Sequence, residues 1–427
     1  MASPLAPPAS AAAAAGGWLD RLLRRRLIAL LEALADGELR ILEPGGLETR
    51  LGTAVDPRES PLRATVTVHD PAFWTRLGLG GTVGAGEAWM DGLWDCDDLV
   101  ALVRLLLRNR ERLDALEGGG ARVAAAALRL LHLLRRNTRA GARRNVAAHY
   151  DLGNEFFALF LDERWRMYSC AMYLGEEESL EQAQERRLEA VCRKLELAPG
   201  DRVIEIGSGW GGFACYAAER FGCRVTTTTI SRRQAEYCRR LVAERGLGDR
   251  VEVLEQDYRD LEGRYDKLVS LEMIEAVGHE YLGAFFAKVG ELLAPHGMAL
   301  VQAITIEERR YERARRSVDF IKRHVFPGSF IPALAPMLAA IARASDLRLF
   351  HLEDIGPSYA LTLREWRRRF LAREAEVAAL GFDRRFRRMW EFYLAYCEGG
   401  FLERALGDVQ MLLVKPRCRR ASLLAFP

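Results

Sequence analysis

The stretch RVIEIGSGWGGFACYAAERFGCRVTTTTIS, residues 202–231, constrains the fold of this chain more than any other part of its sequence. An apolar run ends in a cluster of glycines, a helix-like segment follows, and a second run rich in β-branched residues comes after it. A strand, a glycine-rich turn and a helix in this order are typical of open α/β sheets that bind nucleotide-like cofactors. Gly207, Gly209 and Gly211 would let the backbone turn tightly and approach such a cofactor closely.

The same loop bears on which cofactor is bound. A GxGxG pattern alone is compatible with NAD, FAD or S-adenosylmethionine. The second run ends in TTTTIS, without the acidic residue that would hold a ribose diol. The glycines read GSGWGG rather than GxGxxG, so the third glycine is not where pyrophosphate binders use it to pack the helix. Both departures argue against a dinucleotide and favour S-adenosylmethionine, which has no pyrophosphate.

Strand-like and helix-like segments alternate through the second half of the chain. The strand-like runs are RVIEIG, RVTTTTIS, VEVLEQD, YDKLVSLEMI and MALVQAITI. This alternation predicts a mostly parallel, Rossmann-like α/β sheet with helices on both faces. Helical insertions are expected at 311–350 and 362–396, over the top of the sheet. Asp257 ends the third run, where it would either contact the amino group of a bound adenine or cap a turn.

The 427 residues are enough for two or three cores. Residues 1–17 have low complexity and are predicted to be disordered. Residues 18–115 mix helix-like and strand-like patterns and predict a small α+β domain. Residues 116–145 predict a basic helical linker, and residues 146–427 predict the catalytic domain.

The linker has two interpretations. It is either a solvated connecting helix or a basic amphipathic helix that is attracted to anionic lipid. Nucleic acid is not an expected partner, because the net charge is only +3 and no nucleic-acid-binding module is recognisable. The basic residues of this segment are Arg122, Arg129, Arg135, Arg136, Arg139, Arg143 and Arg144.

Other features bear on the location of the protein. No apolar run approaches the ~20 residues that span a bilayer, and no secretory signal is recognisable. Eight cysteines are scattered without a CxxC pair, which favours free thiols in a reducing cytosol and gives no metal-site spacing. We therefore expect a cytoplasmic protein that associates at most peripherally with a membrane, and we expect no metal.

Several further motifs carry a family resemblance. They are NVAAHYDLGNEFFALFLDERWRMYSCAMY, SLEMIEAVGHEYL, FIKRHVFPGSFIP and EFYLAYCEGGF, in addition to the glycine loop. Together they resemble the cyclopropane-fatty-acyl-phospholipid synthase family, which includes the mycolic acid cyclopropane synthases. The resemblance covers residues from about 140 to 415, and the amino-terminal part is similar to the extra domain of the longer, phospholipid-acting members.

This resemblance implies a class I methyltransferase fold and an enzyme that uses S-adenosylmethionine to add a methylene group across a cis double bond of a phospholipid acyl chain. It also implies a peripheral membrane location and a homodimer. Two residues before the sheet would contact the polar end of the cofactor, and the glycine loop would wrap its methionine part. Residues that follow the second and third predicted strands would supply contacts to sugar and base. The implied cofactor-binding residues are Tyr168, Ser169, Ile204, Glu205, Gly207, Gly209, Gly211, Gly212, Thr229, Ile230, Gln234, Asp257 and Tyr258.

The resemblance further implies bicarbonate as the base, together with an active-site cysteine, Cys397. Two positions depart from the best-known bacterial members, because Gln302 and Ala276 stand where those members have histidine. Glutamine can donate a hydrogen bond to an anion but cannot become a cation. In this region the sequence is closer to the plant cyclopropane synthases. The implied bicarbonate-site residues are Cys170, Glu275, Gln302, Ile304 and Tyr359.

Each of these residues also has an ordinary structural interpretation. Cys170 and Cys397 would be inert buried thiols, Tyr359 a core tyrosine and Glu275 a helix cap. Three other functions stay open. One is a fatty-acid C-methyltransferase that makes a methyl-branched or methylene product, the second is a methyltransferase of soluble small molecules, and the third is an inactive lipid-binding protein.

Overall fold

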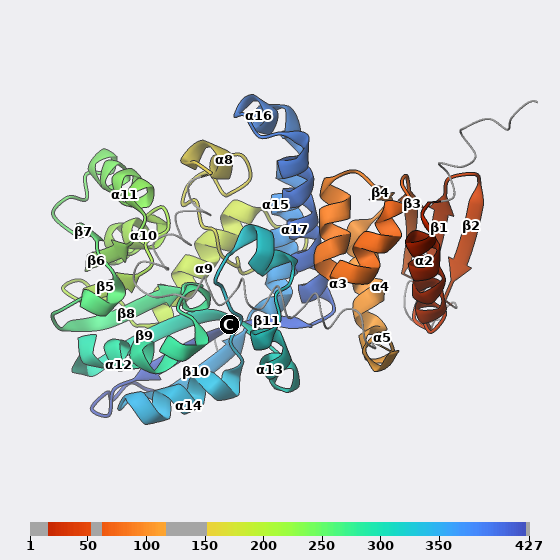
Figure 1. The fold of residues 1–427 in the computed structure, drawn as a ribbon. Helices are drawn as coiled ribbons and strands as arrows, with labels where there is room; N and C mark the ends of the chain where they lie inside the picture. The colour runs from red at the N-terminus through yellow and green to blue at the C-terminus, as the bar shows by residue number, and fades with distance from the viewer. Residues whose placement is uncertain (1–15, 53–61, 117–151, 424–427) are drawn as a thin grey trace, which may run out of the picture. The chain divides into compact units, whose positions relative to one another are not determined.

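The computed structural model describes residues 16–52, 62–116 and 152–423 (Figure 1). Its contacts divide the chain into two compact units, which we call the N-terminal unit and the sheet unit. The described residues of the N-terminal unit are 16–52, 62–116, 317–324 and 374–403, and those of the sheet unit are 152–316, 325–373 and 404–423. Nearly all of the predicted tail and the predicted linker lie outside the described residues.

The N-terminal unit contains a small mixed sheet and several helices, in keeping with the α+β pattern of its sequence. Its sheet has the order β2-β1-β3-β4, in which β1 and β3 are parallel and the other pairs are antiparallel. The strands are β1 (Glu38–Glu43), β2 (Leu47–Leu51), β3 (Arg63–Val68) and β4 (Trp94–Cys96), and the helices are α2 (Trp18–Leu31), α3 (Ala72–Met90), α4 (Leu99–Arg108), α5 (Arg110–Leu116), α16 (Glu374–Ala379) and α17 (Arg384–Leu402).

Helix α17 belongs to this unit although it lies far along the chain. Arg104 and Arg108 of α4 both pair with the Glu403 carboxylate, at 2.7 and 2.9 Å. A Cβ atom at Gly399 would come within 2.6 Å of the Val103 side chain, so the two helices approach closely. The stretch predicted as one catalytic domain therefore contributes a helix to the N-terminal unit as well.

The sheet unit is built on a seven-stranded sheet with the order β10-β11-β9-β8-β5-β6-β7 (Figure 1). The five strands from β9 to β7 in this order are parallel, and β11 is antiparallel to both of its neighbours. The strands are β5 (Arg202–Ile206), β6 (Arg224–Thr229), β7 (Val251–Glu255), β8 (Tyr265–Leu271), β9 (Leu293–Ile306), β10 (Arg348–Asp354) and β11 (Leu406–Val414).

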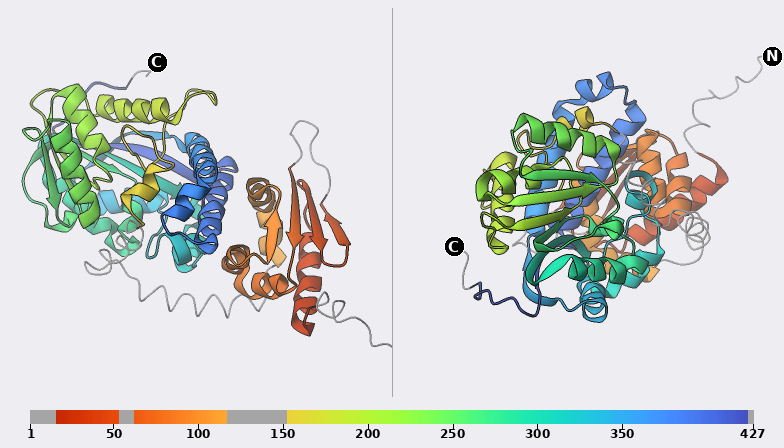
Figure 2. Two further views of the ribbon diagram at one scale, coloured as in Figure 1. Left: turned by 90° about the horizontal axis from the view of Figure 1, so that it is seen from above. Right: turned by 90° about the vertical axis from the view of Figure 1, so that its left-hand side faces the viewer.

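Helices cover both faces of this sheet, as Figure 2 shows. Residues of α9, α10 and α11 join one buried apolar cluster, and residues of α12 and α14 join another. Alternation along β5 sends Val203 to the first cluster and Ile204 to the second. These helices are α9 (Leu180–Lys194), α10 (Gly212–Phe221), α11 (Arg232–Glu244), α12 (Leu282–Leu292) and α14 (Leu334–Ala344).

Shorter elements complete the described chain. The remaining α-helices of the sheet unit are α8 (Asn154–Ala158), α13 (Glu308–Arg316) and α15 (Gly356–Ala372). Three 3₁₀ turns are η1 (Tyr258–Asp260), η2 (Ile274–Ala276) and η3 (His279–Tyr281), and η4 (Ile321–Val325) is a short π-helix. No helix within the described ranges is both long enough and apolar enough to cross a membrane.

The Rossmann-like sheet and its five predicted strands are confirmed. The prediction of helix throughout 311–350 was wrong in part, because residues 326–333 form no helix and β10 begins at Arg348. This strand lies at the sheet edge, and none of its residues is fully buried, so it lacks the apolar alternation that marks a strand in sequence. Strand β11 was not predicted.

Candidate functional site

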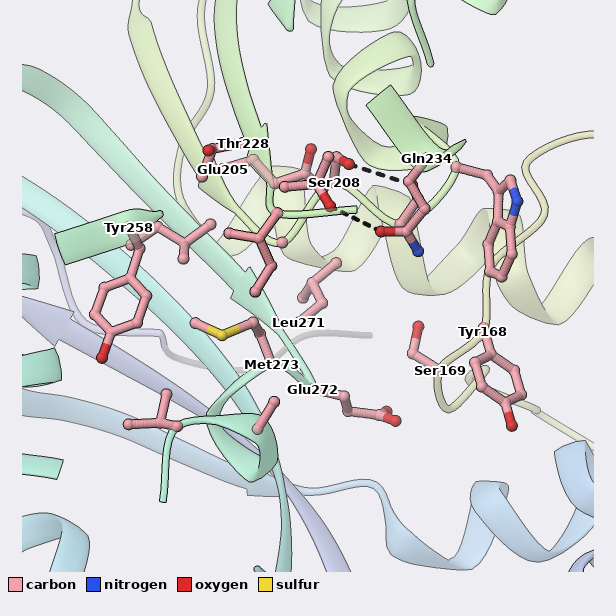
Figure 3. A pocket seen from close by; sticks show the side chains of 18 of the residues that line it. Tyr168, Ser169, Glu205, Ser208, Thr228, Gln234, Tyr258, Leu271, Glu272 and Met273 are labelled. Carbon is pink, nitrogen blue, oxygen red and sulfur yellow. Dashed lines mark hydrogen bonds between the residues drawn. The ribbon is translucent and has the colours of Figure 1, made fainter. Parts of the chain in front are cut away.

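A cavity lies at the carboxyl ends of β5, β6, β7 and β8 (Figure 3). Ligands of open α/β sheets bind at this edge, where the strand order changes direction. Many of the predicted cofactor-binding residues line the cavity, and they come from four separate segments. They are Tyr168, Ser169, Glu205, Gly207, Gly209, Thr229, Ile230, Gln234, Asp257 and Tyr258.

The glycine loop adopts backbone conformations that favour glycine. Gly207, Gly209 and Gly211 have φ of 97°, 50° and 83°, in the left-handed region. The amides of Gly207 and Ser208 both donate to the carbonyl of Thr228, at 3.0 and 2.9 Å, which anchors the loop to β6. A Cβ atom at Gly209 would meet nothing within 4 Å, so the loop leaves open space on its cavity side. This open space fits a ligand held close to the backbone.

Three predicted residues, Ile204, Gly211 and Gly212, do not line the cavity, and their contact with the cofactor stays a prediction. The Ile204 side chain lies in the apolar cluster under α12, because β5 alternates its side chains between the two faces. Gly211 and Gly212 lie at the start of α10. A Cβ atom at Gly212 would come within 2.2 Å of the Trp165 carbonyl oxygen, so this glycine is needed for packing.

Gln234, on the first turn of α11, presents a polar group to the cavity. Its Oε1 accepts a hydrogen bond from Thr229 Oγ1 at 2.9 Å, and its main-chain amide donates to Ser231 Oγ, the cap of the helix, at 3.4 Å. Figure 3 shows the amide nitrogen of Gln234 turned toward the cavity. Because Thr229 fixes the orientation of the amide, Gln234 can donate to a ligand hydroxyl.

Asp257 caps a turn and also lines the cavity. Its carboxylate caps η1 and accepts hydrogen bonds from Arg259 Nε at 2.8 Å and Arg259 Nη2 at 2.6 Å. It also lines the cavity beside Tyr258. The contact with adenine stays a prediction, and Arg259 is the partner that would orient the carboxylate for it.

A cluster of buried polar groups lies beside the cavity, at the end of β8. Its centre is Glu272, which lines the cavity and follows the last residue of the strand with φ of 51°. Glu272 Oε1 accepts hydrogen bonds from the Cys170 main-chain amide and from Gln302 Nε2, both at 2.7 Å. Its Oε2 accepts one from the Tyr359 hydroxyl at 2.6 Å. Three residues predicted to bind bicarbonate therefore bind this carboxylate.

The other two predicted residues of the bicarbonate site contact each other. Glu275 Oε1 accepts a hydrogen bond from the Ile304 main-chain amide at 2.6 Å. Glu275 Oε2 is buried without a hydrogen-bond partner among the described residues. Burial, and then repulsion by Glu272, raise the pKa of Glu275 to about 8, so it is neutral at pH 7. The structure thus brings together all five predicted residues around two acids.

Gln302 bridges two carboxyls through a single nitrogen. Its Nε2 donates to Glu272 and also to Asp408 Oδ2, at 3.0 Å. Its Oε1 accepts from Gln410 Nε2 at 3.0 Å, and Gln410 Oε1 accepts from Lys194 Nζ at 2.6 Å. Because lysine can only donate, this chain of contacts fixes the direction of both amides. Both hydrogens of the Gln302 amide therefore point at carboxyl groups.

The pKa values of Asp408 and Glu272 in this cluster are shifted by different neighbours. Burial, and then repulsion by Glu272, raise the pKa of Asp408 well above its usual range. Burial raises the pKa of Glu272 as well, but the Tyr359 hydroxyl, the Cys170 amide, the neighbouring Asp408 and the charge of Arg187 oppose this. Arg187 is fully buried and donates to Ser169 Oγ at 3.0 Å. We conclude that Asp408 carries the proton and Glu272 carries the negative charge.

The two predicted cysteines take different places. The Cys170 thiol is buried and its Sγ lies 3.1 Å from the Ala171 carbonyl oxygen, and burial raises its pKa well above the usual range. Its main-chain amide is therefore the group that serves the cluster. Cys397 lies on α17 in the N-terminal unit, where burial raises its pKa, and its predicted catalytic role stays a prediction.

Sequence reasoning missed Glu272, Asp408 and Arg187. A signal existed for Glu272 alone, because an acid that directly follows a predicted strand of a parallel sheet lies at the ligand-binding edge. Asp408 is on the unpredicted strand β11, and Arg187 looks like any other charged residue of a helix. Among the described residues, no group of three or more acids, histidines or cysteines has the arrangement of a metal site.

Comparison with known proteins gives related sequences over most of the chain. A family model described as mycolic acid cyclopropane synthetase matches residues 137–411. The tuberculostearic acid methyltransferase of Mycobacterium tuberculosis is 36% identical over 428 residues, which covers 96% of this chain and 93% of that protein. The cyclopropane-fatty-acyl-phospholipid synthase of Escherichia coli strain K12 is 36% identical over 371 residues, which covers 86% of this chain and 90% of that protein.

A solved structure shares the fold of the sheet unit. Mycolic acid cyclopropane synthase CmaA1, crystallised with SAH and CTAB, aligns with a TM-score of 0.60 and 29% sequence identity. The alignment covers 64% of this chain and 98% of that chain. SAH is the demethylated form of S-adenosylmethionine, so the comparison agrees with the cofactor class that the glycine loop favours.

Proposed function

The chain belongs to the mycolic acid cyclopropane synthetase family of S-adenosylmethionine-dependent methyltransferases, and we propose that it converts a cis double bond of a phospholipid acyl chain into a cyclopropane ring. The observation that carries this proposal is the position of the Glu272 cluster. A carboxylate beside the cofactor cavity is placed to accept the proton that ring closure releases.

The cavity residues fit S-adenosylmethionine. We assign the open space at Gly209 to the methionine part, the Gln234 amide to the ribose hydroxyls, and Asp257 with Tyr258 to the adenine. S-adenosylmethionine, when bound, supplies an electrophilic methyl group to the alkene. The protein's part is to hold the two reacting carbons in contact and to exclude water, because an alkene is a weak nucleophile.

An aromatic wall next to Tyr168 supports an apolar substrate. The Trp366 ring lies 5.1 Å from the Tyr168 ring and 6.1 Å from the Tyr359 ring, centroid to centroid. Phe326 lies 6.4 Å from Tyr168 on the same basis. Such faces pack against an acyl chain and stabilise a positive charge that develops on it.

We propose a peripheral location on the cytoplasmic surface of a membrane. Helix α2 supports this, because one of its faces carries Trp18, which is 70% exposed, together with Leu22 and the exposed Arg25 and Arg26. Aromatic, aliphatic and basic side chains on one helix face are typical of helices that lie on anionic membranes. The predicted basic linker lies outside the described residues, and the predicted homodimer stays a proposal.

A second candidate product is a methyl-branched or methylene chain. It is favoured by the relative that matches 96% of this chain, which is named a methyltransferase and not a cyclopropane synthase. Both products begin with methyl transfer to the same double bond. They differ in whether a hydride shift moves the cation before the base removes a proton, so the same site would serve either outcome.

Lipid analysis tests the proposal. The gene is expressed in a host that lacks the activity, and membrane lipids are examined by mass spectrometry and proton NMR. Both candidate products add 14 mass units to an unsaturated chain, and only a cyclopropane gives upfield ring signals. Purified protein that methylates a soluble amine or phenol, and no unsaturated phospholipid in vesicles, would contradict the proposal. Binding of S-adenosylmethionine without turnover on any lipid would contradict it too.

A further inference from the structure

We propose that the Glu272 carboxylate is the proton acceptor of this reaction and takes the place predicted for bicarbonate; this inference rests on the proposed function. The usual expectation for this family is an external anion held by a set of hydrogen-bond donors. Here the chain supplies its own anion to the same donors.

The contacts of the predicted donors carry the argument. The Cys170 amide, the Gln302 amide and the Tyr359 hydroxyl all donate to Glu272, at 2.7, 2.7 and 2.6 Å. The Ile304 amide donates to Glu275 instead. Every predicted donor of the bicarbonate site is therefore already paired with a carboxylate of the chain, so these residues do not fit an additional anion.

The position of Gln302 follows from this arrangement. An amide supplies two hydrogens from one nitrogen and adds no charge beside the carboxylate. Gln302 uses one on Glu272 and one on Asp408. A neutral histidine carries one N–H and could donate to only one of these acids. Glutamine in place of histidine therefore allows this residue to donate to Asp408 as well as to Glu272.

The backbone of Glu272 supports a functional role. A residue other than glycine with φ of 51° is uncommon and costs about 1 kcal/mol or more. This conformation turns the side chain of Glu272 toward Ser169 and Tyr168 at the side of the cavity (Figure 3). Burial also raises the pKa of Glu272 above that of an exposed glutamate, which suits a general base.

The proposed reaction has a methyl transfer followed by a proton loss. Methyl transfer to one alkene carbon leaves S-adenosylhomocysteine and a cation on the other carbon. Glu272 takes one proton from the new methyl group, and the electron pair of that C–H bond closes the three-membered ring. For a methylene product, a hydride shift first moves the cation to the methyl-bearing carbon; Glu272 then takes a proton from the methyl group, and the electron pair of that C–H bond forms the C=CH₂ double bond. Glu272 then returns its proton to water. A carboxylate has about four acceptor positions, so three hydrogen bonds still leave it able to accept a proton.

The first test compares full-length Glu272→Gln and Glu272→Gly with the wild type, on vesicles of an unsaturated phospholipid in carbon dioxide-free buffer. We expect wild-type turnover to be the same with and without added bicarbonate. Glu272→Gln should lower turnover by about 10²–10⁴-fold while S-adenosylmethionine affinity stays within a few-fold. Glu262→Gln, at an exposed acid of the same unit, is the control and should match the wild type.

Chemical rescue separates a base from a structural residue. Glycine readily adopts the φ of this position, so Glu272→Gly should fold and leave the three donors facing an open space. Added bicarbonate or formate should then restore a large part of its turnover and should not restore Glu272→Gln. A wild type that depends on bicarbonate, or a Glu272→Gln variant with normal turnover, would overturn the proposal.

Formate binding tests the role of Glu272 without any turnover. If the enzyme acts on no lipid, the proposed function is contradicted, but this measurement can still be made. ¹³C-labelled formate is titrated into each protein and its NMR line width is followed. Glu272→Gly should broaden the signal and the wild type should not. Specific binding of formate by the wild type, or none by the glycine variant, would show that Glu272 does not hold the anion position.

Discussion

Glu272 and Gln302 are joined twice: the main-chain amide of Glu272 donates to the Gln302 carbonyl oxygen at 2.9 Å, and Gln302 Nε2 donates to Glu272 Oε1 at 2.7 Å. The first bond continues the pairing of β8 with β9 by one residue beyond the strand. The second then places the carboxylate at a fixed position beside the cavity. The pairing of β8 with β9 therefore helps to fix the position of Glu272.

Replacing Gln302 tests this relationship. Gln302→Leu leaves Glu272 and Asp408 without their shared donor, and each lost hydrogen bond to a buried acid should lower the free energy of unfolding by roughly 1–3 kcal/mol. Turnover should fall as well, while affinity for S-adenosylmethionine should stay, because Gln302 does not line the cavity. Gln410→Leu removes only the next link and should lower turnover less. Equal losses in both variants, measured by urea unfolding and vesicle assay, would contradict the assignment.

Two glycines of the loop should respond differently to alanine. At Gly209 the new methyl group meets open space that we assign to the cofactor, so Gly209→Ala should weaken S-adenosylmethionine binding at least tenfold with a modest loss of stability. At Gly212 the methyl group would collide with the Trp165 carbonyl, so Gly212→Ala should chiefly lower the unfolding temperature. Calorimetric titration and thermal unfolding separate the two effects. The assignment fails if Gly209→Ala binds the cofactor normally.

Glu275 should make stability depend on pH. Its pKa is raised to about 8 in the folded protein, whereas the unfolded chain loses this proton near pH 4.5. Between these values the folded state holds one proton more, so stability falls as pH rises, by about 1.4 kcal/mol per pH unit for this group. Glu275→Gln removes this contribution and should gain stability over the wild type as pH increases toward 8. Urea midpoints at several pH values measure it, and parallel curves for the two proteins would refute it.

Membrane attachment should depend on basic residues. Replacing Arg135, Arg136, Arg143 and Arg144 by glutamine should weaken binding to anionic vesicles, with a difference that shrinks as salt is raised. These arginines lie outside the described residues, so a second variant, with Arg25 and Arg26 of α2 replaced, compares them with a helix that is described. Sedimentation with vesicles measures both. If neither variant changes binding, the proposal of a charge-driven surface contact is wrong.

Local sequence patterns predicted one part of the site well. The strand–turn–helix pattern predicted the glycine loop around Gly209, and the family resemblance predicted Thr229 and Gln234; all three line the cavity. The fold class and the family were confirmed for the same reason, because several ordered motifs specify them.

The carboxyl cluster could not be predicted in the same way. The partners of Glu272 come from three distant segments, at Cys170, Gln302 and Tyr359, and only the sheet topology brings them to one point. Gln302 was named as a candidate, but the two acids that it contacts were unknown, so its departure from histidine had no explanation. The grouping of α17 with the N-terminal unit was likewise invisible, because it depends on contacts with α4.

Strand β11 is the last strand along the described chain, yet it lies inside the sheet, between β10 and β9. A nascent chain that has not yet delivered residues 406–414 therefore exposes the unpaired edge of β9 and lacks both Asp408 and Gln410. Completion of the reaction chemistry and closure of an aggregation-prone edge thus coincide in a single late docking event. A polypeptide that ends before this segment would lack part of the Glu272 cluster and would expose the edge of β9. We expect such a chain to aggregate or to be degraded.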